Sequence, residues 1–485
     1  MVSTFDLTTA ARQEMTAQGF DPDFPPQAEA ELQQIATRSL PEGILDLRSL
    51  PWSSIDNDDS RDLDQIEVAE RTDAGVCVKV GIADVDWAVT QGSALDLHAQ
   101  SQTTTVYTGV TVFPMLPERL STDMTSLNDD QDRVAVVIEY TVAADGSVAS
   151  HSVYRAMVRN KAQLTYSEVG PFLEGTGPAP RKVADKSELI EQLRLQDEAS
   201  RALLAARHRL GALDIDRTET ESVQVDGRLE IRARRKNRAA ELIEDFMVAA
   251  NSAMAKTLAD AGVSAIRRVV KAPERWPRIV ELASRFGVTL PVAPDAVALN
   301  AFLQSRKAAD PAHYADVSLS VLKLMGPGEY VMSRAGDASA GHFSLAVHDY
   351  THSTAPNRRF ADVVTQRILK AVEGKLTAPY TDDVLTAIAQ NCTLKEDAAR
   401  KVERNMQKRI AAVALSNHIG EQYKAVVTGV VPHKGTFVRL VDPPADGRLM
   451  RGEQGVDVGD QISVRLLAAD PERGFIDFER VVGEK

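Results

Sequence analysis

The chain has 485 residues, of which 44% are hydrophobic and 26% charged, and its formal net charge is −13. This length is too great for one compact core and predicts two or three domains. The acidic balance argues against a protein that coats nucleic acid by bulk attraction, although a nucleic-acid enzyme needs only local positive charge. The two cysteines, Cys77 and Cys392, lack a metal-ligand spacing, which argues against disulfides and zinc.

Residues 1–45 are expected to form a small helical segment. Leu7–Ala17 is periodic, Asp21–Pro26 reads as a turn, and Gln27–Thr37 predicts a second helix. Two helices joined by a turn would suit a helix-turn-helix-like appendage, but no recognition helix can be distinguished, and a packing arm is the alternative.

Residues 46–420 predict a large α+β body. Strand-like runs come first, at Ile66–Glu70, Gly75–Val85, Val134–Val142 and His151–Val158. Long helical patterns follow, at Ser187–Arg209, Arg238–Asp260, Trp276–Phe286, Ala361–Glu373 and Asp382–Ala414. Strands that precede helices in this way are typical of an α+β domain.

Five aspartates lie among residues 56–64, directly before a predicted strand. In an extended chain Asp62 and Asp64 would share one face, while Leu63 and Gln65 would point to the other. Three interpretations compete: a solvated acidic turn, a calcium loop that lacks its glycine at Arg61, and a site where carboxylates hold Mg²⁺ or Mn²⁺ for phosphodiester hydrolysis.

Residues 421–485 predict a small β-barrel. Short strand-like runs separated by Gly, Pro and Asp turns occur at Tyr423–Val431, Gly435–Leu440, Gln461–Leu467 and Gly474–Phe478. Phe437 and Arg439 would suit base stacking and phosphate pairing on the surface of a five-stranded OB-fold. The alternative is an inert barrel with Phe437 in its core.

Several separated motifs occur in one order along the chain. They are Ile55-Asp56 with Asp62-Leu63-Asp64, Gly81–Val85 with Gly92-Ser93, Val106-Tyr107 with Phe113–Pro117, Tyr350–Asp362, and Glu403-Arg404. Together they resemble the RNase II family of 3′→5′ exoribonucleases, from about Ser53 to the C-terminus. The resemblance implies an RNB-type catalytic domain over residues 46–420 and an RNA-binding OB-fold of the ribosomal S-one type over 421–485.

The activity that the resemblance implies is processive, metal-dependent hydrolysis of RNA from the 3′ end, with release of nucleoside 5′-monophosphates. Asp56, Asp62 and Asp64 would bind or orient Mg²⁺, or Mn²⁺, and the attacking water, and Asp64 is expected to be the most sensitive of them. Arg358 would contact the scissile phosphate, since a guanidinium pairs bidentately with phosphate oxygens. The four catalytic residues expected are therefore Asp56, Asp62, Asp64 and Arg358.

Further RNA contacts are implied at Tyr107, which would stack on a base near the 3′ end, at Arg359, which would steady the backbone, and at Glu403, near the terminal nucleotide. Each contact has a structural alternative. Tyr107 would instead be a packing residue and Glu403 half of a helix salt bridge. Asp84 and Asp362 lie in the motifs too, where helix capping or a structural hydrogen bond is the more economical interpretation.

The chain departs from the family pattern in two ways. Gln65 stands where the family has a second adjacent aspartate, so we expect it to ligate the metal without charge and to weaken its binding. About 45 helical residues cannot encode the two cold-shock barrels of relatives, which leads us to expect a more open channel and digestion of duplex RNA with a 3′ overhang as well as single strands.

The alternative function is a regulator that binds RNA and has lost catalysis, suggested by Gln65 in place of a carboxylate. For either function we expect a cytoplasmic monomer without membrane contact, since the sequence has no signal segment, no run of about eighteen apolar residues and no coiled-coil pattern.

Overall fold

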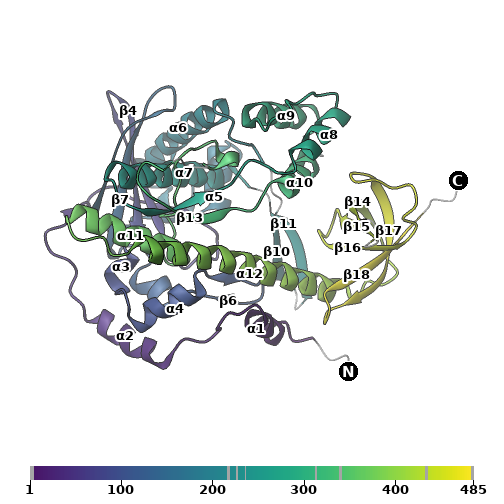
Figure 1. Ribbon diagram of the computed structural model, residues 1–485, viewed down its shortest axis with the longest axis horizontal. Helices are drawn as coiled ribbons and strands as arrows, with labels where there is room; N and C mark the ends of the chain where they lie inside the picture. The colour runs from purple at the N-terminus through teal and green to yellow at the C-terminus, as the bar shows by residue number, and fades with distance from the viewer. Residues whose placement is uncertain are drawn as a thin grey trace.

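The computed structural model describes residues 5–215, 219–225, 228–234, 236–311, 314–337, 341–431 and 435–481. It contains two small helices, a body of sheet and helices, and a β-barrel near the C-terminal end (Figure 1). The α+β fold class with a five-stranded barrel, predicted from the sequence, is confirmed.

The centre of the body is a five-stranded sheet with the order β1-β8-β7-β4-β3. Its strands are β1 (Leu45–Asp46), β3 (Gln65–Thr72), β4 (Gly75–Ala83), β7 (Asp132–Val142) and β8 (Val148–Arg159). β1 pairs with β8 in parallel, and the other neighbours are antiparallel. Val134–Ile138 is a continuous buried run, as expected of a central strand that is covered on both faces.

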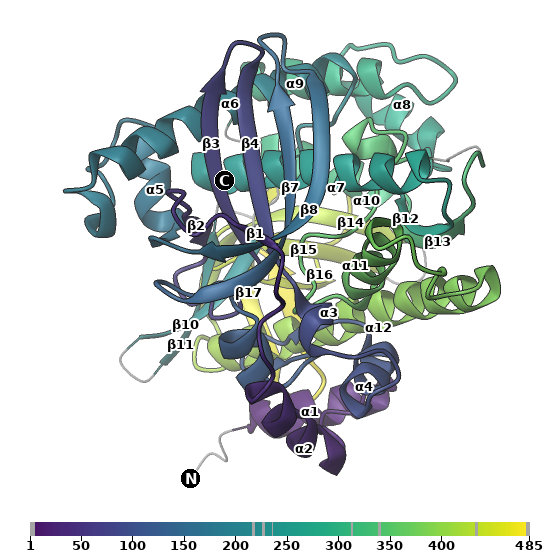
Figure 2. The ribbon, with the colours of Figure 1, turned by 90° about the vertical axis from the view of Figure 1, so that its left-hand side faces the viewer.

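Helices α6 (Ser187–Arg209) and α7 (Arg238–Asp260) pack against this sheet and share its hydrophobic core (Figure 2). Asn237 caps the start of α7 by accepting a hydrogen bond from the backbone N–H of Ala240. The smaller helices of the body are α3 (Val85–Ala88), α4 (Ala94–Gln102), α5 (Tyr166–Leu173) and α11 (Phe360–Glu373). Asp84 caps α3 through the N–H of Trp87, which confirms the capping role expected for it.

Short strand pairs connect these elements. They are β2 (Ser54–Asp56) with β9 (Gln163–Thr165), β5 (Val106–Tyr107) with β6 (Val112–Phe113), β10 (Glu219–Val225) with β11 (Arg228–Arg234), and β12 (Ala265–Val269) with β13 (Glu329–Ser333). A satellite of three helices, α8 (Trp276–Arg285), α9 (Ala296–Ala309) and α10 (Tyr314–Leu324), has its own apolar core around Trp276 and Phe302.

The barrel closes in the order β14-β15-β16-β18-β17. Its strands are β14 (Gln422–Val431), β15 (Gly435–Leu440), β16 (Asp446–Arg451), β17 (Gln461–Asp470) and β18 (Phe475–Arg480). Val438 and Leu440 point into its core, while Phe437 is 37% exposed. The interpretation of Phe437 as a core residue is therefore wrong.

Helix α12 (Asp382–Leu415) runs from the body to the barrel (Figure 1). Leu385 packs in the core of the body, and Leu415 packs in the core of the barrel. Between them, Met406 contacts the apolar face of α1 (Leu7–Ala17), while α2 (Pro26–Ala36) packs on the body. The described helices α1 and α2 thus behave as a packing arm, and none of the described helices is both long and apolar enough to cross a membrane.

Candidate active site

The aspartate run connects β2 to β3 and is held in place by backbone pairing. Ser53 and Glu67 exchange backbone hydrogen bonds, and β2 pairs in parallel with β9. The Ser126 hydroxyl accepts from the N–H of Leu63 at 2.9 Å and donates to the carbonyl of Arg61 at 3.0 Å. The calcium-loop interpretation is wrong, because strands and not helices flank the run.

Asp64 is the most buried carboxylate of the run, with 2% of its surface exposed. Its Oδ1 accepts the backbone N–H of Asn357 at 3.0 Å, and its Oδ2 lies 3.4 Å from Nε of Arg358. Oδ2 receives no hydrogen bond from the described residues. Burial raises the pKa of Asp64 to about 7, repulsion from Asp62 adds to the rise, and attraction to Arg358 opposes it.

Asp56 and Asp62 lie beside this pair and are half-buried. Burial raises the pKa of each carboxyl, and the positive charge of Arg358 offsets part of that rise. One guanidinium thus acts on all three carboxylates, and Arg358 keeps 45% of its side chain exposed. The residues expected to be catalytic therefore lie together. Their burial contradicts the interpretation of the aspartate run as a solvated acidic turn.

Tyr107 stands at the edge of the same site. The residue is 44% exposed, so the interpretation as a buried packing residue is wrong. Its hydroxyl lies near Asp62, and burial together with the charge of that carboxylate raises the pKa of the phenol. Its backbone N–H donates to Oε1 of Glu403 at 3.2 Å, so Glu403 binds the backbone of Tyr107.

Gln65 begins β3, is buried, and pairs with Ile82. In a strand it shares a face with Glu67. Among the described residues, no three His, Cys, Asp or Glu side chains are close enough to form a complete metal site. The donors nevertheless suit Mg²⁺, since an all-oxygen set with the orphaned Oδ2 of Asp64 leaves room for the waters and phosphate oxygens that this ion usually retains.

Arg359 is fixed inside the chain. It donates to Oδ1 of Asp362 at 2.8 Å, and the same oxygen accepts the N–H of Ala355 at 2.8 Å. The structural hydrogen bond expected of Asp362 is confirmed. Arg359 therefore shapes the turn that presents Arg358 and keeps only 20% of its side chain exposed.

A cavity of about 500 Å³ leads from this site to the barrel. Tyr107 and Asp59 line one end, and Arg439 lines the other. Arg404 and Lys408 of α12 lie along it. Phe437 shares the outward face of β15 with Arg439, because alternate residues of a strand point to the same side.

Sequence reasoning missed three positioning residues. Asn357 gives its N–H to Asp64, and its Oδ1 accepts from the hydroxyl of Thr125 at 2.6 Å. Ser126 holds the backbone on both sides of Asp62. Asn357 could have been noticed beside Arg358 in its motif, whereas Thr125 and Ser126 carry no sequence signal.

Comparison with known proteins gives two family matches: RNB domain over residues 44–375 and RNase II-type exonuclease C-terminal S1 domain over residues 421–481. Ribonuclease R 1 of Lactococcus lactis is 28% identical over 491 residues, an alignment that covers 94% of this chain and 58% of the relative. The chain thus spans little more than half the length of that relative.

Solved structures of Mycoplasma genitalium RNase R show the same fold. The complex with ribose methylated single-stranded RNA matches with a TM-score of 0.86 at 22% identity, over 98% of this chain and 78% of the other. The complex with double-stranded RNA matches with a TM-score of 0.84 at 23% identity, over 98% and 84%. With the RNB match extending over more than half of its residues, the chain belongs to the RNB-domain family.

Proposed function

We propose that the chain is a metal-dependent 3′→5′ exoribonuclease that hydrolyses single-stranded RNA processively to nucleoside 5′-monophosphates. The observation that carries the proposal is the pair of Asp64 and Arg358, with Oδ2 and Nε 3.4 Å apart. A buried carboxylate with one oxygen that no donor among the described residues reaches, beside a half-exposed guanidinium, suits a site that binds a phosphate and a cation together. Membership of the RNB-domain family supports hydrolysis as the reaction.

The side chains of the site have separate roles in this proposal. Arg358 binds the non-bridging oxygens of the scissile phosphate and offsets the charge that develops on them. Asp56, Asp62, Asp64 and Gln65 hold the cation, which when bound lowers the pKa of water and stabilises the leaving oxygen. Asp64 also orients the attacking water, because its Oδ2 receives no hydrogen bond from the described residues and can accept one from that water.

The RNA path in this proposal runs through the cavity between the barrel and Tyr107. Arg439, Arg404 and Lys408 supply positive charge along it, and Tyr107 offers an aromatic face for the last base. Phe437 extends the contact on the barrel surface. Solved relatives bind single-stranded and double-stranded RNA, and we include duplexes with a 3′ overhang among the substrates.

The three regions of the chain have different roles in this proposal. Residues 46–420 form the catalytic domain, residues 421–485 form the RNA-binding domain, and residues 1–45 contribute a helical arm. The contact of α1 with α12 supports a structural role for that arm, since Met15 and Met406 share one apolar cluster.

The test is a denaturing gel of 5′-labelled RNA with a hairpin and a 3′ tail, in Mg²⁺ and in EDTA. We expect metal-dependent conversion to one short labelled product and nucleoside 5′-monophosphates. Arg358→Ala should abolish the conversion, whereas Arg71→Ala, an exposed arginine paired with Glu198, should not. Intact RNA in every lane, with a shifted band on a native gel, would instead indicate the RNA-binding regulator that Gln65 suggests.

A further inference from the structure

The N-terminal arm, residues 7–36, holds both ends of α4. At the start of α4, the carboxylate of Glu31 accepts the first two backbone N–H groups of the helix at 2.6 and 2.9 Å. These groups have no partner within the helix, and a negative charge at a helix N-terminus is favourable. At the end of α4, Oε1 of Gln102 accepts the backbone N–H of Asp21 at 3.1 Å. The chain therefore leaves α4 from a point that the arm fixes.

The linking segment, residues 102–107, connects that point to the candidate active site. Thr105 donates its backbone N–H to the carbonyl of Arg358 at 3.0 Å, and a neighbouring backbone bond and a β-bridge strengthen this contact. The last residue of the segment is Tyr107, whose N–H is bonded to Glu403. One short stretch of chain thus joins the arm, the turn that presents Arg358 and the tyrosine.

Helix α1 packs against this segment and along one face of α12. Val106 is fully buried in an apolar cluster that includes Met15 of α1 and Val402 of α12. The residues of α12 on the side of the arm recur every three or four positions, as on one face of a helix. They are Lys395, Ala399, Val402, Met406 and Arg409. Because Glu403 follows Val402 directly, the arm and Tyr107 hold the same turn of α12.

Polar contacts fix the arm on α12 at two places. Glu14 is 8% exposed, and its Oε1 accepts a hydrogen bond from Nδ2 of Asn405 at 2.8 Å, while its Oε2 lies 3.6 Å from Arg409. Nearer the start of α12, the ammonium of Lys395 lies 4.5 Å from the ring centroid of Phe20 and donates to a backbone carbonyl of the arm. Loss of one partner of a buried charged group is costly, so these contacts keep the arm in register with α12.

We propose that the arm positions the catalytic site, with Glu14 and Gln102 as positioning residues that act through α12 and the linking segment on Tyr107 and Arg358. The inference rests on the proposed function, because the reaction that it concerns is RNA hydrolysis at this site. A displacement of about 1 Å can cost on the order of a hundredfold in rate. Contacts outside the site can therefore limit the reaction.

The first test removes the polar link between α1 and α12. Glu14→Ala should slow single-turnover cleavage of 5′-labelled RNA at least fivefold and lengthen the final labelled product, because the ring of Tyr107 is displaced. Glu14→Gln keeps an oxygen for Asn405 and should restore most of the rate and the natural product length. A natural rate and product length in Glu14→Ala would overturn the inference.

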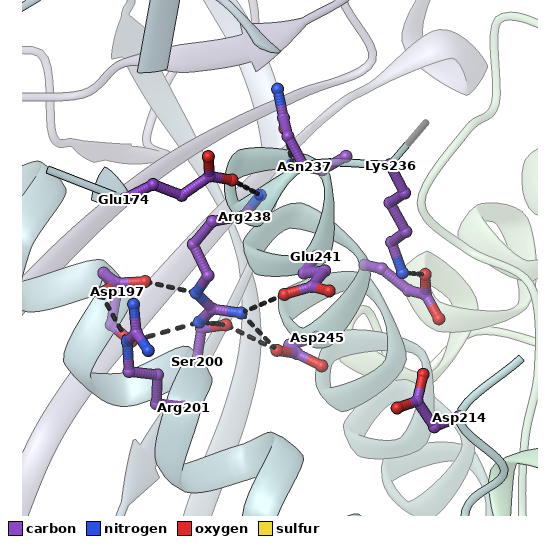
Figure 3. Close-up of polar contacts among 12 residues, drawn as sticks. Glu174, Asp197, Ser200, Arg201, Asp214, Lys236, Asn237, Arg238, Glu241 and Asp245 are labelled. Carbon is purple, nitrogen blue, oxygen red and sulfur yellow. Dashed lines mark hydrogen bonds and ion pairs between the residues drawn. The ribbon is translucent and has the colours of Figure 1, made fainter. Parts of the chain in front are cut away.

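Asp197→Ala is the matched control for a loss of stability. Asp197 of α6 pairs with Arg238 of α7 at 2.6 Å, as Figure 3 shows, and so joins two helices as Glu14 does. The side chains of Asp197 and Glu14 are 14% and 10% exposed. Urea unfolding should show a loss of stability in both alanine variants, whereas only Glu14→Ala should change the product length. The same lengthening in Asp197→Ala would show an effect of stability alone and would overturn the inference.

The second test does not depend on how Glu14→Ala folds. Gln102→Ala removes the acceptor for the N–H of Asp21, and Leu97→Ala, an exposed position on the same helix, is its control. Gln102→Ala alone should lengthen the final product, and it should add nothing in the Tyr107→Ala background, because both changes act on one ring. Further lengthening in the double variant would contradict positioning through Tyr107. Failure of the natural chain to release any nucleoside 5′-monophosphate would overturn the proposed function itself.

Discussion

Glu403 accepts a hydrogen bond of 3.2 Å from the backbone N–H of Tyr107, 296 positions earlier in the chain. The bond fixes β5 against α12 and so helps to hold Tyr107 near Asp62. Glu403→Ala should lower the rate of RNA degradation about tenfold, because it removes the hydrogen bond that positions Tyr107. Glu403→Gln should retain most of the rate, because an amide oxygen also accepts. Equal losses in both variants would show that the negative charge matters and not the bond.

The ring of Tyr107 is expected to decide how short the final product becomes. Tyr107→Ala removes the aromatic face while the backbone bond to Glu403 remains. We expect a longer labelled end product on a sequencing gel, with Tyr107→Phe giving the natural length. An unchanged product length in Tyr107→Ala would remove this residue from the terminal-base contact.

Arg358 and Arg359 are neighbours with different expected roles. Arg358→Lys should reduce kcat about a hundredfold with little effect on stability, because the guanidinium is half-exposed and is proposed to contact the phosphate bidentately, which an ammonium cannot do. Arg359→Lys should lower the free energy of unfolding by about 3 kcal/mol, since it disturbs a buried pair with Asp362. Single-turnover kinetics measure the loss of rate, and urea unfolding measures the loss of stability. A stability loss in Arg358→Lys together with a rate loss in Arg359→Lys would contradict the roles given to the two residues.

The raised pKa of Asp64 makes stability depend on pH. The carboxyl has a pKa of about 7 when folded and near 3.8 when exposed, so the folded chain keeps its proton as the unfolded chain loses it. Stability should therefore fall as pH rises from about 4 to 7. In EDTA at pH 8, Asp64→Asn should be more stable than the natural chain by up to about 4 kcal/mol, and the gain should vanish near pH 4.

Urea unfolding followed by the fluorescence of the three tryptophans, of which Trp52 and Trp276 are buried, would measure this difference. Asn keeps an oxygen for the N–H of Asn357, so the substitution removes charge with little loss of contact. Saturating Mg²⁺ should stabilise the natural chain more than the variant. Equal stability of Asp64→Asn and the natural chain at pH 8 would mean that the buried charge of Asp64 does not destabilise the fold.

With Gln65 at this position, the metal should bind more weakly than it would with an aspartate. Gln65→Asp restores a charged ligand, and we expect the Mg²⁺ concentration for half-maximal activity to fall about tenfold. Gln65→Asn is the control without charge. Calorimetric titration of the metal without RNA gives a second measurement, and unchanged binding in Gln65→Asp would show that this residue does not face the ion.

The sequence predicted long amphipathic helices best. The predicted ranges of α6 and α7 match the observed ones residue for residue, because an apolar stripe over 23 residues is a strong signal. The fifth barrel strand β16 was missed, since Leu449 is its only buried side chain. The hairpin β10–β11 was overlooked despite Asp226-Gly227 between alternating runs, which is a recognised hairpin signal.

At the site, the ordered motifs predicted candidate catalytic residues, which the structure places together, and the fold determined how they are held. Nothing near Ser126 in the sequence indicates that its hydroxyl would bridge Arg61 and Leu63. Such contacts join segments far apart in the chain and depend on tertiary packing alone. The exposure of Tyr107 and the burial of Arg359 could not be read from their motifs for the same reason.

Helix α12 sets the distance between Tyr107 and the barrel. Glu403 binds the backbone of Tyr107, and Leu415 packs in the core of the barrel. The stretch of helix between Glu403 and Leu415 is about 18 Å long, and it separates the two regions that the proposed RNA path contacts. If RNA follows the proposed path, a strand shorter than this span would lose its contact with the barrel while its last base still lay on Tyr107. The length at which the RNA is released would then be set by this part of α12.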